Sequence, residues 1–325
     1  MRAVVLEDKG GPEVLTVRDV PEPEPGPEEV LVKVRATALN RADLLQRMGF
    51  YPGPPMEHEI PGLEFSGTVV GVGSRVADRS VGDEVMGIVG GAAYAEQLAV
   101  HERQVMNVPS SVDLADAAAI PEVWITAFDA LVAQGGLTSG LTALVHAGAS
   151  GVGTAAIQIA NAIGARIAVT ASTGKVEACR SLGAHLAIDY TAQDFAEEVL
   201  AFTDGVGADV ILDVIGGDYL ARNLACVKTK GTIIQVGVMG DGSPAIDLGR
   251  LLRGRIRLIG TVLRARPLDE KIAITQQFAR EILPLFDRGS MHPVIDSRYD
   301  LDAIADAHRY MESNANVGKI LIDVG

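Results

Sequence analysis

Cysteine is scarce in this sequence, which has only Cys179 and Cys226 in a chain of 325 residues. They lie far apart and form no C-x-x-C pair, so they cannot supply the four cysteines that a structural zinc site usually needs. The six histidines are equally scattered, with no H-x-x-x-H pair that would point to a catalytic metal. We therefore expect no metal site, and we interpret both cysteines as small buried hydrophobic residues.

Runs of lysine and arginine are absent as well, and the formal net charge is -14. An acidic chain is repelled by the phosphates of nucleic acids and by anionic lipids, although one local basic patch could overcome that repulsion. The longest apolar stretch, residues 143–164, is interrupted by histidine, serine and glycine, and acidic residues follow Met1 too soon for a secretory signal. These absences predict no nucleic-acid partner, no membrane partner and a cytoplasmic location.

What is present is typical of folded globular domains: 48% of the residues are hydrophobic and 22% are charged. The length makes two domains the natural expectation. Short β-like runs separated by glycine or proline occur at residues 29–36, 67–72, 84–89 and 93–100. Strands of this length and spacing predict a small β-barrel or sandwich over residues 1–118.

The texture then changes, because helix-like and strand-like segments alternate. A helix-spaced apolar pattern covers residues 114–131. Strands are expected at residues 143–147, 166–171, 186–188, 210–214, 232–236 and 256–261, and helices at 152–163, 175–182 and 194–202. Such alternation needs crossover connections, so we predict an α/β fold with a doubly wound parallel Rossmann sheet over residues 119–264.

After residue 265 the alternation stops. We expect helices at residues 269–286 and 301–312 and a closing strand at 318–323. A lone strand has to pair with another, and the N-terminal β-domain is the available partner. Residues 265–325 are therefore predicted to complete the first domain.

The strongest local signal is a glycine-rich turn between a strand and a helix, at residues 144–153. We expect Gly148 to permit the sharp turn, Gly151 to let the backbone approach a pyrophosphate, and Gly153 to let helix and strand pack closely. Amide groups at the start of the helix would face the anion. This setting predicts dinucleotide binding, although packing alone can also demand glycine.

The choice of dinucleotide is read after the next strand, where an acid would hold the ribose hydroxyls of NAD. This sequence has Ser172, Thr173 and Lys175 there and no acid. Two hydroxyl donors and one cation suit a 2′-phosphate, so we predict NADPH as the cofactor. The alternative is that Lys175 is merely an exposed residue in the first turn of a helix.

A family resemblance rests on several of these segments. Residues 62–67, Gly-Leu-Glu-Phe-Ser-Gly, resemble the G-H-E-x-x-G segment of zinc alcohol dehydrogenases with Leu63 in place of the zinc-binding histidine. Residues 38–43 resemble the pattern of zinc-free quinone oxidoreductases where zinc enzymes carry a catalytic cysteine. Residues 118–128 and 263–266 extend the similarity over essentially the whole chain. The sequence thus resembles the zeta-crystallin-like quinone oxidoreductases among the medium-chain dehydrogenase/reductases, and within them the stress-inducible NADPH-dependent subgroup.

The resemblance implies a GroES-like β-barrel domain beside the Rossmann domain, and a set of site residues. The catalytic pocket would be lined by Asn40, Asp43 and Tyr51. The cofactor would be bound by Thr126, Gly148, Ser150, Gly151, Val152, Gly153, Ser172, Lys175, Tyr190, Gly237, Met239, Leu263 and Arg264. Ser172 and Thr173 replace the Gly-Ser pair that the family pattern leads us to expect. Tyr51 could alternatively anchor its own loop.

The function expected from these features is reduction of small quinones by NADPH without zinc, with Tyr51 or Asn40 donating a hydrogen bond to the substrate oxygen. One alternative is an NADPH-dependent reductase of enone or enoyl double bonds, which uses the same parts. Another is a non-catalytic crystallin-like or RNA-binding protein. The apolar run at residues 256–262 is a candidate sheet edge for a homodimer, with a tetramer possible, unless it is covered inside the sheet.

Overall fold

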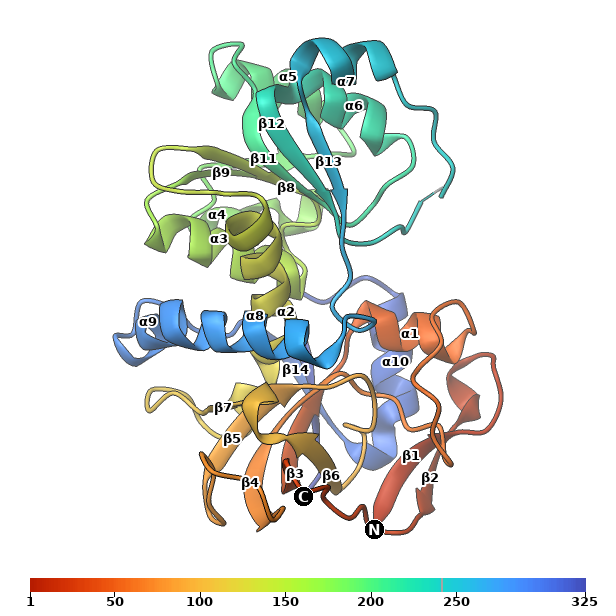
Figure 1. Cartoon of the computed structure of the whole chain (residues 1–325). Helices are drawn as coiled ribbons and strands as arrows, with labels where there is room; N and C mark the ends of the chain where they lie inside the picture. Colours follow the sequence, from red (N-terminus) through yellow and green to blue (C-terminus); the bar gives the residue numbers. More distant parts are fainter. Residues whose placement is uncertain (241) are drawn as a thin grey trace. The chain divides into compact units, whose positions relative to one another are not determined.

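The computed structural model describes residues 1–240 and 242–325, and the chain divides into two compact units. Unit 1 comprises Met1–Ile125 and Arg264–Gly325, and unit 2 comprises Thr126–Leu263. In Figure 1 the colours of unit 1 therefore come from both ends of the bar, and those of unit 2 from its middle. Helix α2 (Pro121–Phe128) contains the point at which the chain passes from unit 1 to unit 2.

Unit 1 is built on a seven-stranded sheet in the order β14-β15-β3-β4-β5-β7, with β6 paired to β3, and on a separate β1-β2 pair. Its strands are β1 (Arg2–Leu6), β2 (Leu15–Asp19), β3 (Glu29–Ala38), β4 (Glu64–Val72), β5 (Glu84–Ile88), β6 (Gln97–His101), β7 (Val105–Asn107), β14 (Ile295–Asp300) and β15 (Lys319–Asp323). Its helices besides α2 are α1 (Arg41–Arg47), α8 (Leu268–Glu281), α9 (Leu283–Asp287) and α10 (Ile304–Glu312).

Strand β3 is the centre of this sheet. Val30, Val32 and Val34 alternate with more exposed residues and are buried, as expected for a strand with one face on a core. The strand pairs with β4, β6 and β15, and the β15 pairing sets Leu321 opposite Ala38. The predicted pairing of the C-terminal strand with the N-terminal β-structure is thus confirmed.

Two predicted helices are divided in the structure. The segment 114–131 becomes a 3-10 turn (Asp116–Ala119), helix α2 and a π-helical turn (Asp129–Gln134). The segment 269–286 becomes α8 and α9, with a break at Ile282. Each division has a proline in the first turn of its second helix, Pro121 in α2 and Pro284 in α9. Proline lacks the backbone donor that a helix interior requires, so it is tolerated at a helix start and not in the middle.

Unit 2 is a six-stranded parallel sheet in the order β10-β9-β8-β11-β12-β13, which confirms the predicted doubly wound Rossmann arrangement. Its strands are β8 (Thr142–Val145), β9 (Arg166–Ala171), β10 (Leu186–Asp189), β11 (Ala208–Asp213), β12 (Val227–Gln235) and β13 (Arg257–Gly260). Its helices are α3 (Gly151–Ala162), α4 (Val176–Ser181), α5 (Phe195–Phe202), α6 (Tyr219–Cys226) and α7 (Leu248–Gly254). The strand order reverses between β8 and β11, and ligands of such sheets bind beyond the carboxyl ends of the strands at that point.

The structure also shows where the two cysteines and the apolar run at residues 256–262 lie. Cys179 and Cys226 are both buried, as predicted, and burial raises the pKa of their thiols to about 11 and about 12. Strand β13 lies at the edge of its sheet, and Leu258 on it and Val262 just beyond it are exposed. Among the described helices, none combines the length and the apolar character that crossing a membrane requires.

Candidate functional site

A buried polar cluster in unit 1 contains Asn40 and the two charged residues Glu64 and Lys319. The Lys319 ammonium donates to Asn40 Oδ1 at 2.7 Å and to the Leu39 carbonyl at 2.6 Å, and it forms an ion pair with Glu64 Oε1 at 2.7 Å. The Glu64 side chain is fully buried, and that of Lys319 is 4% exposed. The other Glu64 oxygen accepts from the Glu122 backbone N–H, at the start of α2, at 2.8 Å. The pair thereby joins β4, β15 and the first turns of α1 and α2.

This cluster uses both hydrogens of the Asn40 amide. Asn40 Nδ2 donates to Glu64 Oε1 at 2.8 Å and to the Ala38 carbonyl at 3.2 Å. An amide nitrogen has two hydrogens, so neither is left for a substrate. The amide oxygen already accepts from Lys319. Asn40 is therefore poorly suited to donate a hydrogen bond to a substrate.

Asp43 is fully buried and lies in the first turn of α1. Asn40 and Asp43 form a capping box, in which Asp43 Oδ2 accepts from the Asn40 backbone N–H at 2.8 Å. The same carboxylate accepts from the Tyr94 hydroxyl at 3.0 Å and from the Gly62 N–H at 3.3 Å. Burial raises the pKa of Asp43 to about 6, although these hydrogen bonds and nearby cations act in the opposite direction. Its contacts are those of a residue that fixes the helix start.

Tyr51 is only partly buried and lies against Arg264. The guanidinium lies 5.1 Å from the centre of the Tyr51 ring and donates to the Tyr51 carbonyl at 3.2 Å, to the Gly90 carbonyl at 2.7 Å and to Gln46 Oε1 at 2.6 Å. In the described part of the chain, the hydrogen bonds of Tyr51 are made by its backbone. Burial raises the pKa of Tyr51, so the phenol keeps its proton at neutral pH and can donate it in a hydrogen bond.

In unit 2 the glycine-rich turn follows β8 and leads into α3. The residue with a left-handed backbone is Ala147, with φ of 57°, and not Gly148. Gly148 is required for a different reason, because a Cβ there would lie 2.5 Å from the Cβ of Val169. A Cβ on Gly153 would collide with the Ala147 carbonyl oxygen, which agrees with the close packing predicted for that residue. The prediction that Gly148 itself permits the sharp turn is thus corrected.

Helix α3 begins with Ser150 as its N-cap, whose hydroxyl oxygen accepts from the Gly153 N–H at 3.1 Å. Gly151 and Val152 occupy the first turn, where backbone N–H groups have no partner within the helix. Such a helix start suits a pyrophosphate. The turn therefore fits a dinucleotide, with Ser150 acting as a cap.

Ser172 and Lys175 follow β9, where Lys175 closes a 3-10 turn (Thr173–Lys175). Tyr190, which is 45% exposed, is tied to the end of the same strand by its N–H, which donates to the Ala171 carbonyl at 3.2 Å. The structure also brings an acid to this place. Asp189, the last residue of β10, accepts from the Thr191 hydroxyl at 2.6 Å, and hydrogen bonds from Thr173 and Thr191 lower the pKa of its carboxyl.

The remaining predicted cofactor residues are distributed as follows. Gly237 and Met239 lie beyond β12 in a loop whose Met239 N–H donates to the Ile215 carbonyl at 3.0 Å, beside the end of β11. Thr126 is buried on α2, and Leu263 is partly buried. Thr126 and Leu263 are the first and last residues of unit 2, whereas Arg264 belongs to unit 1.

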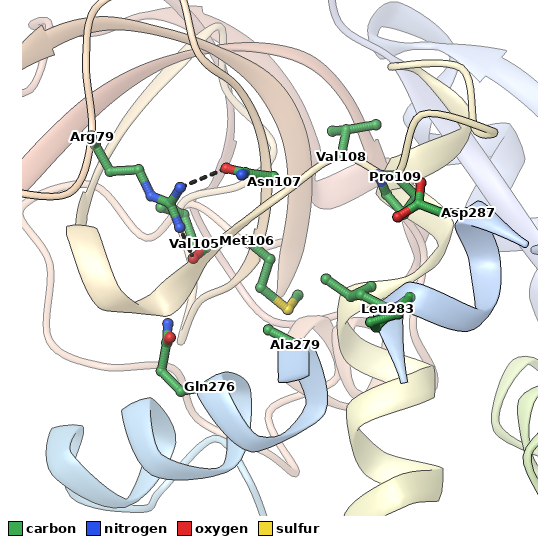
Figure 2. A pocket seen from close by; sticks show the side chains of 11 residues that line it. Arg79, Val105, Met106, Asn107, Val108, Pro109, Gln276, Ala279, Leu283 and Asp287 are labelled. Atoms are coloured by element: carbon green, nitrogen blue, oxygen red, sulfur yellow. Dashed lines mark hydrogen bonds between the residues drawn. The ribbon is translucent and has the colours of Figure 1, made fainter. Parts of the chain in front are cut away.

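Unit 1 also contains a cavity of about 260 Å3, which is lined by none of the predicted site residues. Figure 2 shows it between β7 and the helices α8 and α9, with Arg79 on one side and Asp287 on the other. Arg79 already donates to Asn107 Oδ1 and to the Val105 carbonyl, and Asp287 accepts from Ser110. Its two charged residues are thus engaged with the protein, and we assign it no ligand.

Known proteins match this chain over most of its length. Residues 26–110 match the alcohol dehydrogenase GroES-like domain, and residues 151–280 match the zinc-binding dehydrogenase family. A quinone oxidoreductase of Pseudomonas aeruginosa is 34% identical over 319 residues, which cover 96% of both proteins. The chain belongs to the quinone oxidoreductase-like family of medium-chain dehydrogenase/reductases. The human synaptic vesicle membrane protein VAT-1 homolog is 31% identical over 344 residues, covering 100% of this chain and 87% of that protein.

Solved structures agree with this family assignment. The crystal structure of Escherichia coli quinone oxidoreductase complexed with NADPH has a TM-score of 0.90 at 26% identity, covering 100% of both chains. The crystal structure of JamJ enoyl reductase in its apo form has a TM-score of 0.90 at 25% identity, covering 100% of this chain and 99% of that one. The predicted combination of a GroES-like domain with a Rossmann-type sheet is confirmed, and the family makes the protein an oxidoreductase.

The matched family model is that of zinc-binding dehydrogenases, so we compared the side chains around Leu63 with the ligands that zinc requires. Leu63 offers no ligand atom, and the adjacent Glu64 carboxylate is paired with Lys319. Within residues 1–240 and 242–325, no three histidine, cysteine, aspartate or glutamate residues cluster so as to hold a metal ion. A cation already occupies the place beside Glu64, so these residues do not fit zinc.

Sequence reasoning missed three residues that shape the candidate sites of this family member. Glu64 was quoted only as part of a motif, and Lys319 only as part of a closing strand, because their pairing joins distant segments. Asp189 was missed because the expected acid was sought on β9, whereas it ends the neighbouring strand β10. A charged residue directly before an apolar run, such as Lys319 before residues 320–322 of β15, was the signal available.

Proposed function

We propose that this protein transfers reducing equivalents from NADPH to small quinones without zinc. The observation that carries the proposal is the buried Glu64–Lys319 pair beside Asn40, because the adjacent Leu63 replaces the motif's zinc-binding histidine and the Glu64 carboxylate is already neutralised by a cation. A quinone is an electron-poor acceptor, so its reduction needs positioning and a hydrogen-bond donor more than a strong Lewis acid. The similarity to quinone oxidoreductases of two bacteria supports the choice of substrate.

In this proposal unit 2 is the nucleotide-binding domain and unit 1 the substrate domain. The N–H groups of Gly151 and Val152 would hold the pyrophosphate, and Ser172 with Lys175 would hold the 2′-phosphate. Thr126, Tyr190, Gly237, Met239, Leu263 and Arg264 complete the proposed cofactor-binding set. NADPH, when bound, supplies the reducing equivalents. Its 2′-phosphate would lie near Asp189, whose negative charge opposes the attraction of Lys175.

Tyr51 is the proposed catalytic donor in unit 1. Tyr51 is partly exposed, and its hydroxyl keeps its proton and makes no hydrogen bond with another described residue, whereas both Asn40 amide hydrogens are already used. The Tyr51 hydroxyl would stabilise the negative charge that develops on the quinone oxygen. Asp43 is proposed as a positioning residue, because its contacts fix Asn40 and the start of α1.

The alternative function is reduction of enone or enoyl double bonds by NADPH. The observation in its favour is the similarity to JamJ enoyl reductase over the whole chain. Hydride addition to an activated double bond would use the same Tyr51 donor. The two functions differ in the acceptor and can be separated by direct comparison of substrates.

The deciding experiment measures nicotinamide oxidation with NADPH and with NADH. Chelator-treated protein is offered an ortho-quinone, a para-quinone and an enone. Quinone turnover that prefers NADPH and survives the chelator is the expected result. Turnover of the enone alone would move the function to double-bond reduction, and no turnover of any substrate would favour a non-catalytic role.

The role of Tyr51 is tested by Tyr51→Phe, which removes only the hydroxyl. Loss of a donor to a developing oxyanion should lower kcat by about 100-fold. Tyr299→Phe is the matched control. Tyr299 lies on β14, so this substitution removes a hydroxyl outside the proposed pocket. Equal kcat values for wild type and Tyr51→Phe with several quinones would remove Tyr51 from the mechanism.

We also propose a cytoplasmic homodimer formed by pairing the β13 edges of two copies. Strand β13 has an unpaired edge, and exposed apolar side chains lie on it and nearby: Leu248, Leu252, Leu258 and Val262. Sedimentation of wild type should give a dimer, and Leu258→Lys should shift it toward monomer. A monomeric wild type would refute the pairing, and a larger species would point to a tetramer.

A further inference from the structure

Four buried polar side chains form a chain of hydrogen bonds across unit 2. They are Thr170 at the end of β9, His146 directly after β8, Asp213 at the end of β11, and Asn223 on α6. Thr170 and His146 are each 1% exposed, and Asn223 and Asp213 are fully buried. No step of the proposed reduction uses any of them, so their presence in an apolar interior needs another explanation.

The donors and acceptors of this chain have a single consistent direction. Asn223 Nδ2 donates to Asp213 Oδ2 at 2.8 Å, which turns Asn223 Oδ1 toward His146. His146 Nε2 lies 2.8 Å from that oxygen and must therefore carry the ring hydrogen. His146 Nδ1 is then an acceptor for the Thr170 hydroxyl, at 3.1 Å. The imidazole is thus held as one neutral tautomer.

The surroundings of the imidazole favour the same neutral form. The rings of Phe195 and Tyr219 pack edge-on against His146, each with its centre 4.7 Å away. Burial is the largest influence and lowers the pKa of His146. Arg222 acts in the same direction, whereas Asp213 and the hydrogen bond with Asn223 oppose it. A second proton on the ring would also face the Thr170 hydroxyl hydrogen and break that bond.

The two terminal side chains of this hydrogen-bond chain, Thr170 and Asp213, accept hydrogen bonds from backbone N–H groups in the loops beyond the sheet. At one end, Thr170 Oγ1 accepts from the N–H of Ala147, the left-handed residue just before Gly148. At the other end, Asp213 Oδ1 accepts from the N–H groups of Ile215 at 2.6 Å and Gly216 at 2.9 Å. The Ile215 carbonyl in turn accepts from Met239 and Gly240.

These loops follow β9, β8, β11 and β12, and they include the point where the strand order reverses. That is where a doubly wound sheet binds a dinucleotide. The chain of hydrogen bonds therefore connects the loop after β9, where the 2′-phosphate is proposed to bind, with the loop that contains Gly237 and Met239. Rigid placement of several loops at once lowers the entropic cost of binding a long ligand across them.

We propose that His146 and Thr170 are positioning residues for the dinucleotide: through one locked tautomer, they hold the loops that bind it. This inference rests on the proposed use of a nicotinamide dinucleotide but is independent of the substrate that is reduced. It assigns a role to a histidine that no sequence motif had singled out.

The test compares variants at two buried hydroxyls, those of Thr170 and Thr203. Thr170→Val removes the hydroxyl with little change of shape, and Thr170→Ser keeps it. Thr203→Val is the control in the same unit. Its hydroxyl donates to the Val199 carbonyl at 2.7 Å and accepts from the Gly207 N–H at 2.9 Å, just before the amino end of β11. The variants are compared by thermal melting, by the equilibrium Kd for NADPH from its fluorescence, and by kcat and KM.

Thr170→Val should raise the Kd and the KM for NADPH about tenfold, the effect of one lost buried hydrogen bond, while kcat changes less than about twofold. Thr170→Ser should restore the affinity to within about twofold of wild type. Thr203→Val should lower the melting temperature as much as Thr170→Val without changing the Kd. His146→Phe should behave as Thr170→Val does.

Unchanged Kd in Thr170→Val, or equal Kd changes in Thr170→Val and Thr203→Val, would overturn the positioning role. A wild type that binds NADPH but reduces no quinone would refute the proposed function alone, and the Kd comparison would still decide the inference. A wild type that binds neither NADPH nor NADH would overturn both.

Discussion

Replacing Lys319 with methionine should strongly destabilise unit 1. The ammonium makes three short contacts, with Leu39, Asn40 and Glu64, and is almost completely shielded from water. Lys319→Met leaves the Glu64 carboxylate buried with only the Asn40 amide and the Glu122 N–H as partners. Removing one member of a buried ion pair costs about 3 to 5 kcal/mol, because the remaining charge is uncompensated.

The double variant Glu64→Gln/Lys319→Met supplies the internal control. It removes both charges and keeps an acceptor that can face the Asn40 amide or the Glu122 N–H. Replacing both members of a buried pair is often nearly neutral, so the double variant should recover most of the lost stability. Arg18→Met is the surface control, because its pair with Glu7 is more than half exposed and should contribute about 1 kcal/mol or less.

The assay is urea denaturation followed by tryptophan fluorescence. Trp124 is the only tryptophan of the chain, belongs to unit 1 and packs against Phe286, with ring centres 4.6 Å apart. Its signal therefore reports on the unit that contains the pair. A loss below about 1 kcal/mol in Lys319→Met, or a double variant no more stable than the single one, would refute the account of the buried pair.

Three further predictions concern single residues. The pKa of Asp43 is raised by burial to about 6, so the folded state holds this proton more tightly than the unfolded state does. The stability contributed by Asp43 should then be complete below about pH 4 and fall by about 3 kcal/mol as the pH rises through 6. The check is urea denaturation of wild type and Asp43→Asn at pH 4 to 7. Parallel curves of unfolding free energy against pH for the two proteins would contradict this prediction. Gly153→Ala should disrupt the turn after β8 and abolish NADPH binding, whereas Gly260→Ala, whose added Cβ meets no atom within 4 Å, should bind NADPH normally. Equal binding by the two variants would contradict the packing argument. Asp189→Asn should raise the preference for NADPH over NADH by about twofold to fivefold, since an exposed charge acts weakly, and an unchanged ratio of Kd values would place Asp189 outside the phosphate site.

The sequence predicted those strands and helices whose own residues carry a hydrophobic pattern or a cap. Most parallel strands of unit 2 contain short apolar runs, and some of the helices between them begin with a cap such as Asp194 before α5. Strand β14 was not predicted, because its sequence from Ile295 to Asp300 is mostly polar and only partly buried. It is a strand because it pairs with β15, and a tertiary pairing of this kind leaves no periodic signal.

The candidate site was predictable as a set of positions and less so as a set of roles. The glycine turn indicated where a dinucleotide could bind, since strand, turn and helix are adjacent in sequence. Which glycine is required for which reason depended on Val169, which lies on the neighbouring strand. Likewise, Asp43 and Asn40 were predicted as equal partners of Tyr51, and their contacts with Tyr94, Glu64 and Lys319 come from segments far apart in the chain.

Hydrogen-bond capacity is what separates these roles, and it can be counted only when all partners are known. Asn40 has two amide hydrogens and both are used, so its position beside a substrate would not make it a donor. Asp43 accepts from three groups within unit 1 and has no exposed surface, so its effect on a reaction must pass through α1. Tyr51 alone of the three keeps a protonated, partly exposed donor. In the proposed mechanism Tyr51 is therefore the donor, because the Ala38 carbonyl and Glu64 already use both Asn40 amide hydrogens, and Lys319 neutralises the Glu64 carboxylate.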